Sequence, residues 1–550
     1  MLPRSAMNFK DRLARWYDTT FLDLARQLRW SFVPPLMVYL AAGVSGLTSI
    51  VGTFFIKDYL GLSAAFIASL AFWASIPWTL KMPLGHLVDL MWRWKASLVY
   101  LGAGLIALSL MIMYGLIAHT QEMAQFASIE TWFVLSAILA PVGYVVQDVV
   151  ADAMTVDAVP IVDASGAPRP AEEVKAMHTT MQTLGRFAVI SGFVMVAAVN
   201  IFMFAGAAEM PAAQLADVYA RIDLIALVIP VLSVAGVILG DLAVRRRERA
   251  LRSGGLSEDE IRAAHSVDAE TTEPKPWLLL GGLAFAVFTI SVGAGGLPFS
   301  QEIVFTGSMV IVIFLIGRLL SELGPDQARA LIGTAIIIFA FRAVPLPGPG
   351  QVWFEIDVLG FDQQFLSVLS LITSCLALLG MVLLRPLIAK RSIAYVVALL
   401  TIASGILALP NIGLYYGLHE WTAPATGGIV DARFIAILDT AIESPLGQIS
   451  MIPMLAWIAQ NAPRRLKATF FAVMASFTNL ALSASSLATR YLNELFIITR
   501  EVRDRDTGAV AVTANYDQLG ILLIVVALIS VAMPLLTIFA IQRSRFHTAQ

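Results

Sequence analysis

The chain has 550 residues, of which 58% are hydrophobic and only 14% are charged, and its mean hydropathy is +0.78. An ordinary soluble domain carries roughly 25% charged residues, so this composition excludes a soluble protein and predicts an integral membrane protein. The net charge of -2 leaves no basic excess that would favour nucleic acid as a partner.

The first thirty residues mix Arg and Lys with Leu, Phe and Trp and contain no apolar core of signal-peptide length. Residues 1–30 therefore predict an amphipathic helix that lies at the membrane interface on the cytoplasmic side.

Long apolar runs follow, and they predict transmembrane helices. A helix needs about 20 mostly apolar residues to cross the hydrocarbon core, whereas a barrel strand needs about 10 alternating ones. The runs here are long and do not alternate, which indicates an all-α protein of about fourteen spans. The predicted spans are 33–56, 64–85, 96–118, 131–153, 182–205, 222–244, 277–297, 303–322, 328–345, 363–387, 392–414, 432–459, 469–492 and 517–541.

The connecting loops predict the orientation, because Lys and Arg favour the cytoplasmic side of short loops. Basic residues fall on one side if the N-terminus is inside, and the loops on the other side, such as 119–130 and 206–217, carry no Lys or Arg. Both termini are therefore expected in the cytoplasm. The basic positions are Arg12, Arg15, Arg93, Lys95, 245–249, Lys390, Arg391, 464–467, Arg543 and Arg545.

An internal repeat links the two halves of the chain. Residues 54–70, "FFIKDYLGLSAAFIASL", align with 353–369, "WFEIDVLGFDQQFLSVL", at a constant offset of 299 with six identities and no gap. Both copies stand between two predicted spans, and repeats of this kind are frequent in transporters. The pattern predicts two six-helix halves in parallel register, with a helix pair inserted between them.

The loop "GHLVDLMWRWK" follows the first copy and has a recognisable spacing of Gly85, Asp89 and Arg93, with Lys95 behind them. It resembles the loop between helices 2 and 3 of the major facilitator superfamily. The resemblance implies a transporter of two pseudo-symmetric six-helix bundles around a central site. Gly85 would allow close helix approach, Asp89 would latch the bundles in one state, and Arg93 and Lys95 would hold the loop at the cytoplasmic face.

Two carboxylates stand out in "GYVVQDVVADAMTVD", near the end of the fourth span. Asp148 and Asp152 are four residues apart and share one helix face. Carboxylates are costly in the membrane and are expected to face the bundle interior with a partner or a proton. Arg186, about one turn into the fifth span, is the predicted partner.

This acidic pair, followed one helix later by Gly185 and Arg186, resembles the folate-biopterin transporter branch of that superfamily. The stretch "FRAVPLPGPGQVWFEIDVLGFDQQFL" resembles the start of the second half of the same branch. Related muropeptide permeases and acetyl-CoA transporters share the acidic fourth helix. The resemblance therefore implies a transporter of a medium-sized organic anion, with a folate or pterin as the first substrate class and a muropeptide or acyl-CoA compound as the second.

The second half has charged positions of its own. Asp439 and Glu443 are again four residues apart in the span that corresponds to the fourth, so the acidic pair is predicted to be duplicated. Arg342 ends an apolar run before a Pro and Gly cluster that should break the helix. Its guanidinium could bind an anionic group or extend to the membrane interface, and the sequence favours neither.

Little in the sequence favours an enzyme or a metalloprotein. The single cysteine, Cys375, cannot form an internal disulfide, and we expect it to be a buried small residue. None of the six histidines stands in a pair with metal-ligand spacing, and no arrangement of nucleophile, base and oxyanion donors is recognisable. We therefore expect no enzymatic activity, no metal and no cofactor.

The sequence as a whole predicts a monomeric secondary transporter, coupled to protons, in the plasma membrane of a bacterium. The alternative from another class is a non-transporting assembly or scaffold protein with the same fold, for which the inserted helix pair would be a docking surface. The predicted organisation is an N-terminal helix at 1–30, a six-helix bundle at 31–244, a linker at 245–276, an inserted helix pair at 277–324 and a second six-helix bundle at 325–550.

Overall fold

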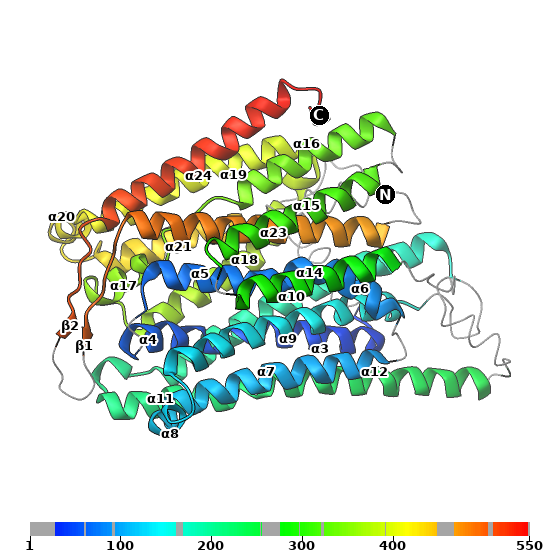
Figure 1. Cartoon of the computed structure of the whole chain (residues 1–550), viewed down its shortest axis with the longest axis horizontal. Coiled ribbons are helices and arrows are strands. Elements are labelled where there is room, and N and C mark those ends of the chain that lie inside the picture. Colours follow the sequence, from blue (N-terminus) through cyan, green and yellow to red (C-terminus); the bar gives the residue numbers. More distant parts are fainter. Residues whose placement is uncertain are drawn as a thin grey trace, which may run out of the picture.

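The computed structural model shows a bundle of long helices that run close to the long axis of the molecule (Figure 1). It describes residues 28–59, 62–90, 94–160, 169–253, 255, 276–295, 297–320, 324–390, 392–447, 467–503 and 510–547. Most of the predicted N-terminal helix and of the predicted linker lies outside these ranges.

The six predicted spans of the first half appear as helical segments, and two of them are interrupted by short 3-10 turns. Its elements are η2 (Trp30–Phe32), α3 (Val33–Val44), η3 (Ser45–Thr48), α4 (Ser49–Tyr59), α5 (Ala64–Ser75), η4 (Ile76–Leu80), α6 (Lys81–Leu90), α7 (Lys95–Ala118), α8 (Thr120–Ala124), α9 (Ile129–Asp157), α10 (Ala171–Met203), η6 (Ala207–Glu209), α11 (Ala212–Ala226) and α12 (Val228–Ser253). The last helix continues to Ser253, past the predicted end of the first bundle at residue 244.

An inserted helix pair and the second half follow. These elements are α14 (Pro276–Ala294), α15 (Ser300–Leu320), α16 (Pro325–Arg342), α17 (Pro349–Asp357), α18 (Gln363–Lys390), α19 (Ile393–Tyr415), α20 (Leu418–Ala425), α21 (Ala432–Gly447), α23 (Lys467–Leu495), the strands β1 (Val502–Arg503) and β2 (Val510–Val512), and α24 (Leu519–Gln542). The two strands pair antiparallel in a small hairpin.

Every predicted span coincides with a helical segment wherever its residues are described. Within the described residues, nine helices are long and apolar enough to cross a membrane by length and composition. The other predicted spans correspond to helices that are broken, more polar or described only in part. These are the α5 to α6 segment, α14, the α16 to α17 segment, α21 and α23.

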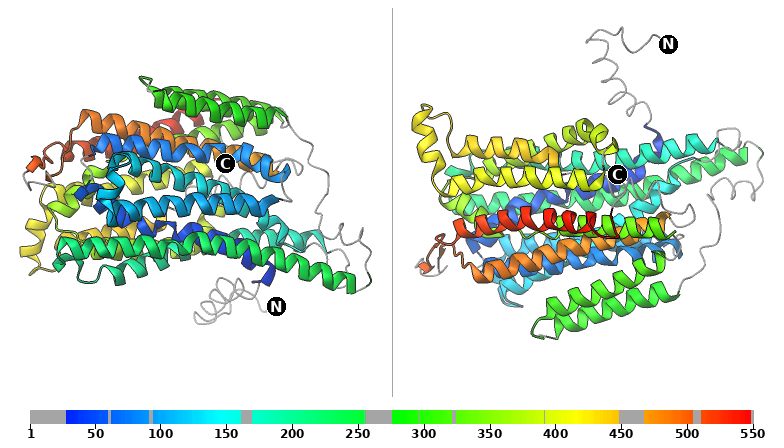
Figure 2. Two further views of the ribbon diagram at one scale, coloured as in Figure 1. Left: turned by 60° about the horizontal axis from the view of Figure 1, so that its bottom comes forward. Right: turned by 90° about the horizontal axis from the view of Figure 1, so that it is seen from above.

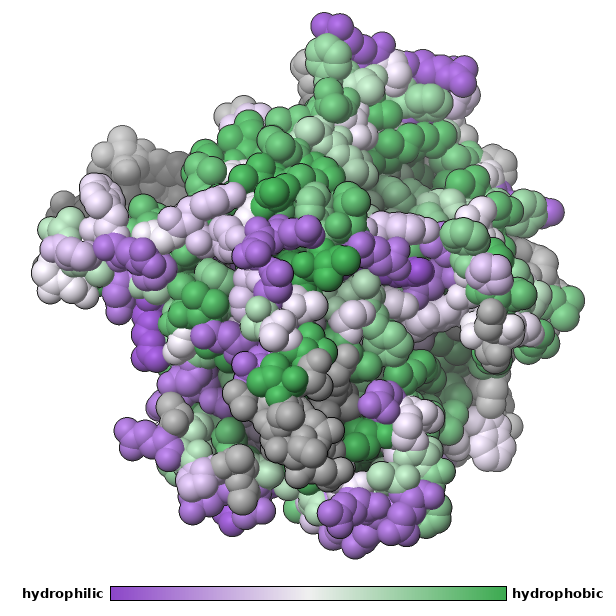
Figure 3. Space-filling view, turned by 60° about the vertical axis from the view of Figure 1, so that its left-hand side comes forward, coloured by the Kyte–Doolittle hydropathy of each residue, from purple (hydrophilic) through white to green (hydrophobic). Residues whose placement is uncertain are grey.

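The bundle has two distinct ends. One, here called the hairpin end, carries α8, α20 and the β1–β2 hairpin, and the other, here called the C-terminal end, carries the last residues of α6, α12 and α24 (Figure 1). Figure 3 turns the hairpin end partly forward and shows hydrophilic side chains in groups between hydrophobic ones. Such a mixed surface fits an end that meets water, whereas α7, α12 and α24 expose many large hydrophobic side chains along their length.

The internal repeat is visible in the structure as a shared helix start. The Ser63 side chain accepts a hydrogen bond of 3.1 Å from the Phe66 N–H, and Asp362 does the same for Phe365 at 2.7 Å. Both pairs are 299 residues apart, and both cap the second span of a half. Asp357, one of the repeated residues, also accepts a hydrogen bond of 2.6 Å from the Tyr516 hydroxyl.

Glycines allow two pairs of first-half helices to pack closely. A Cβ atom on Gly43 of α3 would lie 2.0 Å from the Val189 carbonyl oxygen of α10, and Gly192 faces the same crossing. Gly102 of α7 and Gly143 of α9 face each other in the same way. Small residues at such crossings are typical of membrane helices, because backbones can then approach without a side chain between them.

Two helix pairs form the seam between the halves. The α5 helix packs against α23, and α10 packs against α18. The inserted pair α14 and α15 forms a separate layer on the outside of the bundle (Figure 2), where it contacts α6, α23 and α5. The insertion therefore lies over one seam and touches both halves.

Candidate functional site

The charged residues of the first half meet at Lys81, the first residue of α6. Its Nζ lies 2.6 Å from Asp148 Oδ2 and 2.7 Å from Asp152 Oδ2. The two aspartates occupy one face of α9, as their spacing predicted. One ammonium group therefore pairs with both carboxylates.

A hydroxyl from a third helix completes the cluster. Tyr39 of α3 donates a hydrogen bond of 2.6 Å to Asp152 Oδ1. The ring of Tyr39 packs on Gly185 of α10, where a Cβ atom would lie 2.9 Å from the ring carbon Cε2. Gly185, which belongs to the motif that resembles the family, thus packs against the tyrosine that donates to Asp152.

The cluster is unevenly exposed. The side chains of Lys81 and Asp148 are 19% and 18% exposed, whereas that of Asp152 is 45% exposed. Lys81 carries one positive charge against two negative ones, so ionised side chains here leave an excess of one negative charge. Asp152 is the carboxylate that a proton or a solute from outside the protein can reach most easily.

Arg186 does not form the predicted ion pair with either aspartate in the described part of the structure. Its side chain is exposed, although its charge lies close enough to attract Asp148. Neighbouring residues on a helix point about 100° apart, and Gly185 takes the position that faces Tyr39. The guanidinium is consequently left beside the cluster rather than inside it.

The sequence reasoning missed Lys81 and Tyr39. Lys81 had a signal, because it is an ionisable residue inside the predicted span 64–85, and such residues in a membrane usually mark a functional site. Tyr39 had none, since an isolated tyrosine in an apolar helix is common and only the packing of α3 against α9 and α10 places its hydroxyl.

The predicted duplicate of the acidic pair has a different environment. Asp439 of α21 is buried and accepts a hydrogen bond of 2.9 Å from the Asn411 amide of α19. The comparable helices of the first half, α9 and α7, are joined by a hydrogen bond of 2.9 Å between the Ser136 and Ser109 hydroxyls. Asp439 lies in the first half of α21, whereas Asp148 lies in the last third of α9, and the Glu443 side chain is outside the described residues.

Arg342 is the last residue of α16, directly before the predicted break in the seventh span. Its side chain is partly buried, and its Nε has no hydrogen-bond partner among the described residues. No ion pair of Arg342 is found within the described residues, and its planar guanidinium has the geometry to bind an anionic group.

The break after Arg342 is held open by α23. The Ser485 hydroxyl donates to the Val344 carbonyl at 2.5 Å, and the Asn493 amide donates to the Pro347 carbonyl at 3.2 Å. The Leu346 N–H donates to the Thr489 hydroxyl at 2.9 Å. Side chains of α23 thereby replace the hydrogen bonds that the broken helix loses.

The predicted gating loop is described only in part. Gly85 and Asp89 belong to α6, and Lys95 begins α7, but Arg93 and the Asp89 side chain are outside the described residues. A Cβ atom on Gly85 would meet Val149 of α9 at 4.0 Å, an ordinary contact. The helix approach at Gly85 is therefore less close than the crossing at Gly43.

Comparison with known proteins supports the resemblances seen in the sequence. Residues 308–548 match the model of the BT1 family. A folate-biopterin transporter of Synechocystis sp. is 23% identical over 470 residues, which cover 84% of this chain and 75% of that protein.

Solved transporter structures share the fold. A mutant of the peptide transporter POT in complex with sulfate has a TM-score of 0.58 at 14% identity and covers 94% of each chain. A POT family transporter in complex with 5-aminolevulinic acid has a TM-score of 0.57 at 13% identity, over 93% of this chain and 95% of that one. The nucleoside transporter NupG has a TM-score of 0.53 at 11% identity, over 92% of this chain and 99% of that one.

These likenesses agree with the family resemblance and confirm the fold that the sequence motifs predicted. The chain is a multi-span membrane protein with the fold of the major facilitator transporters, and its residues 308–548 match the BT1 family.

Proposed function

We propose that the protein is a proton-coupled secondary transporter that moves a medium-sized organic anion, with a folate or pterin as the first candidate. The observation that carries this proposal is the cluster of Lys81, Asp148 and Asp152 inside the first helix bundle. Ionisable groups within transmembrane helices are costly and usually mark substrate or proton pathways. The relative named a folate-biopterin transporter supports the substrate class.

The charges of the cluster suggest how a proton could be coupled to transport. With both carboxylates ionised, Lys81 balances only one of them. A proton on Asp152, the more exposed of the two, leaves Lys81 and Asp148 as a neutral pair. A neutral cluster costs less to enclose when the two bundles close around it.

Two arginines would bind the anion. Arg186 is exposed beside the cluster, and Arg342 belongs to the other half of the chain. A planar guanidinium can form two parallel hydrogen bonds with a carboxylate. An anion held between the halves would then favour closure, as alternating access requires.

Transport into proteoliposomes tests the proposal. The purified protein would be assayed for uptake of labelled folates, pterins, muropeptides and acyl-CoA compounds, with and without an imposed proton gradient. We expect a folate or pterin to accumulate faster with the gradient. Asp148→Asn and Asp152→Asn should lose this acceleration but retain exchange of substrate for substrate, because the anion site is intact.

Asp326→Asn is the matched control, since Asp326 is an exposed residue of the first turn of α16 and pairs with Arg329 at the surface. It should transport like the unchanged protein. If both cluster variants keep their proton-driven uptake, the coupling role of the aspartates is wrong. If none of the four compound classes is taken up, the substrate proposal is wrong.

A further inference from the structure

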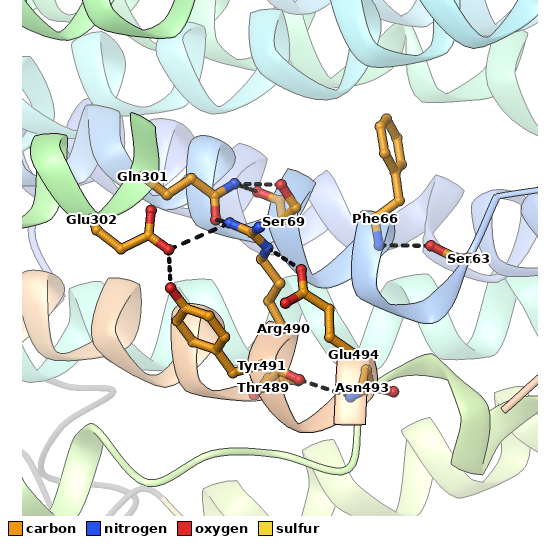
Figure 4. A network of polar contacts seen from close by, with 10 residues as sticks. All are labelled: Ser63, Phe66, Ser69, Gln301, Glu302, Thr489, Arg490, Tyr491, Asn493 and Glu494. Carbon is orange, nitrogen blue, oxygen red and sulfur yellow. Dashed lines mark hydrogen bonds and ion pairs between the residues drawn. The ribbon is translucent and has the colours of Figure 1, made fainter. Parts of the chain in front are cut away.

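The inserted helix pair meets the rest of the protein through a polar network at the hairpin end (Figure 4). At its centre is Gln301 in the first turn of α15, a residue that is only 2% exposed. Its amide nitrogen donates to the Ser69 carbonyl of α5 at 3.2 Å and to the Ser69 hydroxyl. Its amide oxygen accepts a hydrogen bond of 3.2 Å from Arg490 of α23.

Gln301 therefore bridges the two halves, since α5 belongs to the first and α23 to the second. Both ends of one amide are used, so the bridge exists only while the two helices are side by side. A buried amide that loses one hydrogen-bond partner is no longer satisfied by either protein or water, and this costs free energy. Separation of α5 from α23 at this point would incur that cost.

A second contact anchors Arg490 to the inserted pair. Its Nη1 lies 3.6 Å from Glu302 Oε1, and Tyr491 donates a hydrogen bond to the same carboxylate. The Arg490 Nε donates to Glu494 at 2.8 Å. Arg490 is thus held in its bridging position from both α15 and its own helix.

The face of α23 that carries Arg490 also contacts the first half at two positions nearer the middle of the helix. Asn479 donates to the Trp78 carbonyl of η4 at 3.2 Å, and the Ser483 hydroxyl lies 2.7 Å from the Ser75 hydroxyl. Positions 479, 483 and 490 share one face of a helix. The residues that hold the break of the seventh span, at 485, 489 and 493, lie on the neighbouring face.

The hairpin end is also closed on the other side of the bundle. Gln363 of α18 donates a hydrogen bond of 2.8 Å to the Tyr219 hydroxyl of α11, across the two halves. Ile356 and Leu366 of the second half pack on the first-half cluster around Phe54. The structure thus shows the state in which the halves meet at this end.

We propose that the inserted helix pair is a latch that stabilises the closed hairpin end, with Gln301 as the positioning residue that joins α5 to α23. The inference rests on the alternating-access part of the proposed function and extends it to a segment for which that function has no role. Two bundles that rock about a central site must separate at this end once per cycle. A third element bonded to both sets the ratio of the closed to the open state.

Distance measurements between spin labels test the latch. Cys375→Ser gives a chain without cysteine, in which Ala65→Cys at the start of α5 and Leu495→Cys at the end of α23 would carry the labels. In Gln301→Ala the long-distance population should rise roughly tenfold relative to the short one, because a hydrogen bond to a charged group and one to the backbone are lost. Arg490→Gln should shift the distribution in the same direction.

Gln327→Ala is the control, because Gln327 is an exposed glutamine on α16. It should leave the distribution unchanged. An unaltered distribution in both Gln301→Ala and Arg490→Gln overturns the latch. Variants that unfold without opening also overturn it, because the contacts would then serve only stability. The measurement needs no substrate, so it gives its answer whether or not the transport assay succeeds.

Discussion

At the scale of single residues, the protein brings three charged side chains together among its helices. Lys81 is the residue on which the cluster depends, because it is the cation bonded directly to both Asp148 and Asp152. Two carboxylates on adjacent turns of one helix repel each other. The lysine converts that repulsion into two short ion pairs.

Replacement of Lys81 should therefore lower the unfolding temperature, and a second substitution should restore it. In Lys81→Met the two carboxylates lose their common cation, and we expect a clear fall in the thermal unfolding temperature in detergent. Adding Asp148→Asn removes one of the negative charges and should restore most of the loss. The measurement is thermal unfolding of the two variants beside the unchanged protein.

Arg329→Met provides the comparison, since it removes the cation of an exposed ion pair with Asp326. Exposed pairs contribute about 0 to 1 kcal/mol, so its unfolding temperature should hardly change. A double variant no more stable than Lys81→Met would show that the carboxylates do not repel each other in the folded protein.

At the scale of the elements, helix crossings and helix breaks are matched by particular side chains. The α3 and α10 helices approach so closely that only glycine fits at positions 43 and 192, where they cross. The break between α16 and α17 is satisfied by hydroxyl and amide groups of α23. Close packing at small residues and hydrogen bonds of polar side chains thus stabilise the helix contacts that the hydrophobic effect stabilises in a soluble protein.

The crossing at Gly43 predicts a sharp difference between two glycines. Gly43→Val should lower the yield of folded protein and the unfolding temperature, because a Cβ atom at this position would overlap the Val189 carbonyl oxygen. Gly104→Val on α7 should have little effect, since nothing lies within 4 Å of its Cβ position. Both variants would be compared by size-exclusion chromatography and thermal unfolding.

Equal losses in the two variants would indicate a general effect of valine in these helices rather than the crossing.

Cys375 illustrates the same dependence on packing. We expected a buried residue from its apolar surroundings, but it is exposed on α18. An apolar neighbourhood in a membrane helix does not distinguish a surface that faces lipid from one that faces protein.

At the scale of the whole molecule, the loops on either side of α8 and the loop before α11, which lack Lys and Arg, lie at the hairpin end (Figure 1). The end of α12 carries Arg245, Arg246, Arg249 and Arg252 at the C-terminal end of the bundle (Figure 1). Basic loops favour the cytoplasm. We therefore propose that the C-terminal end is cytoplasmic and the hairpin end is outside.

Labelling of single cysteines in intact cells tests this orientation. In the Cys375→Ser background, Ala425→Cys at the end of α20 should react with a maleimide that cannot cross the membrane. His547→Cys near the C-terminus should react only after the cells are made permeable. Both positions are exposed, so access to the reagent decides the result. The reverse pattern would invert the proposed topology.

The sequence by itself determined the class of protein, the positions of the helices, the repeat and the shared face of Asp148 and Asp152. These features depend on hydropathy and spacing along the chain, which a helix converts into geometry by a fixed rule. The family resemblance rested on the same local motifs, and the comparisons agree with it.

Only the tertiary structure decided which residues meet. It pairs the aspartates with Lys81 rather than Arg186, joins Asp439 to Asn411, and places Gln301 between the halves. Each step along a helix turns a side chain by about 100° and moves it by about 1.5 Å. Contacts between helices therefore depend on the rotation and height of each one, which packing against several neighbours sets and no local pattern in the sequence records.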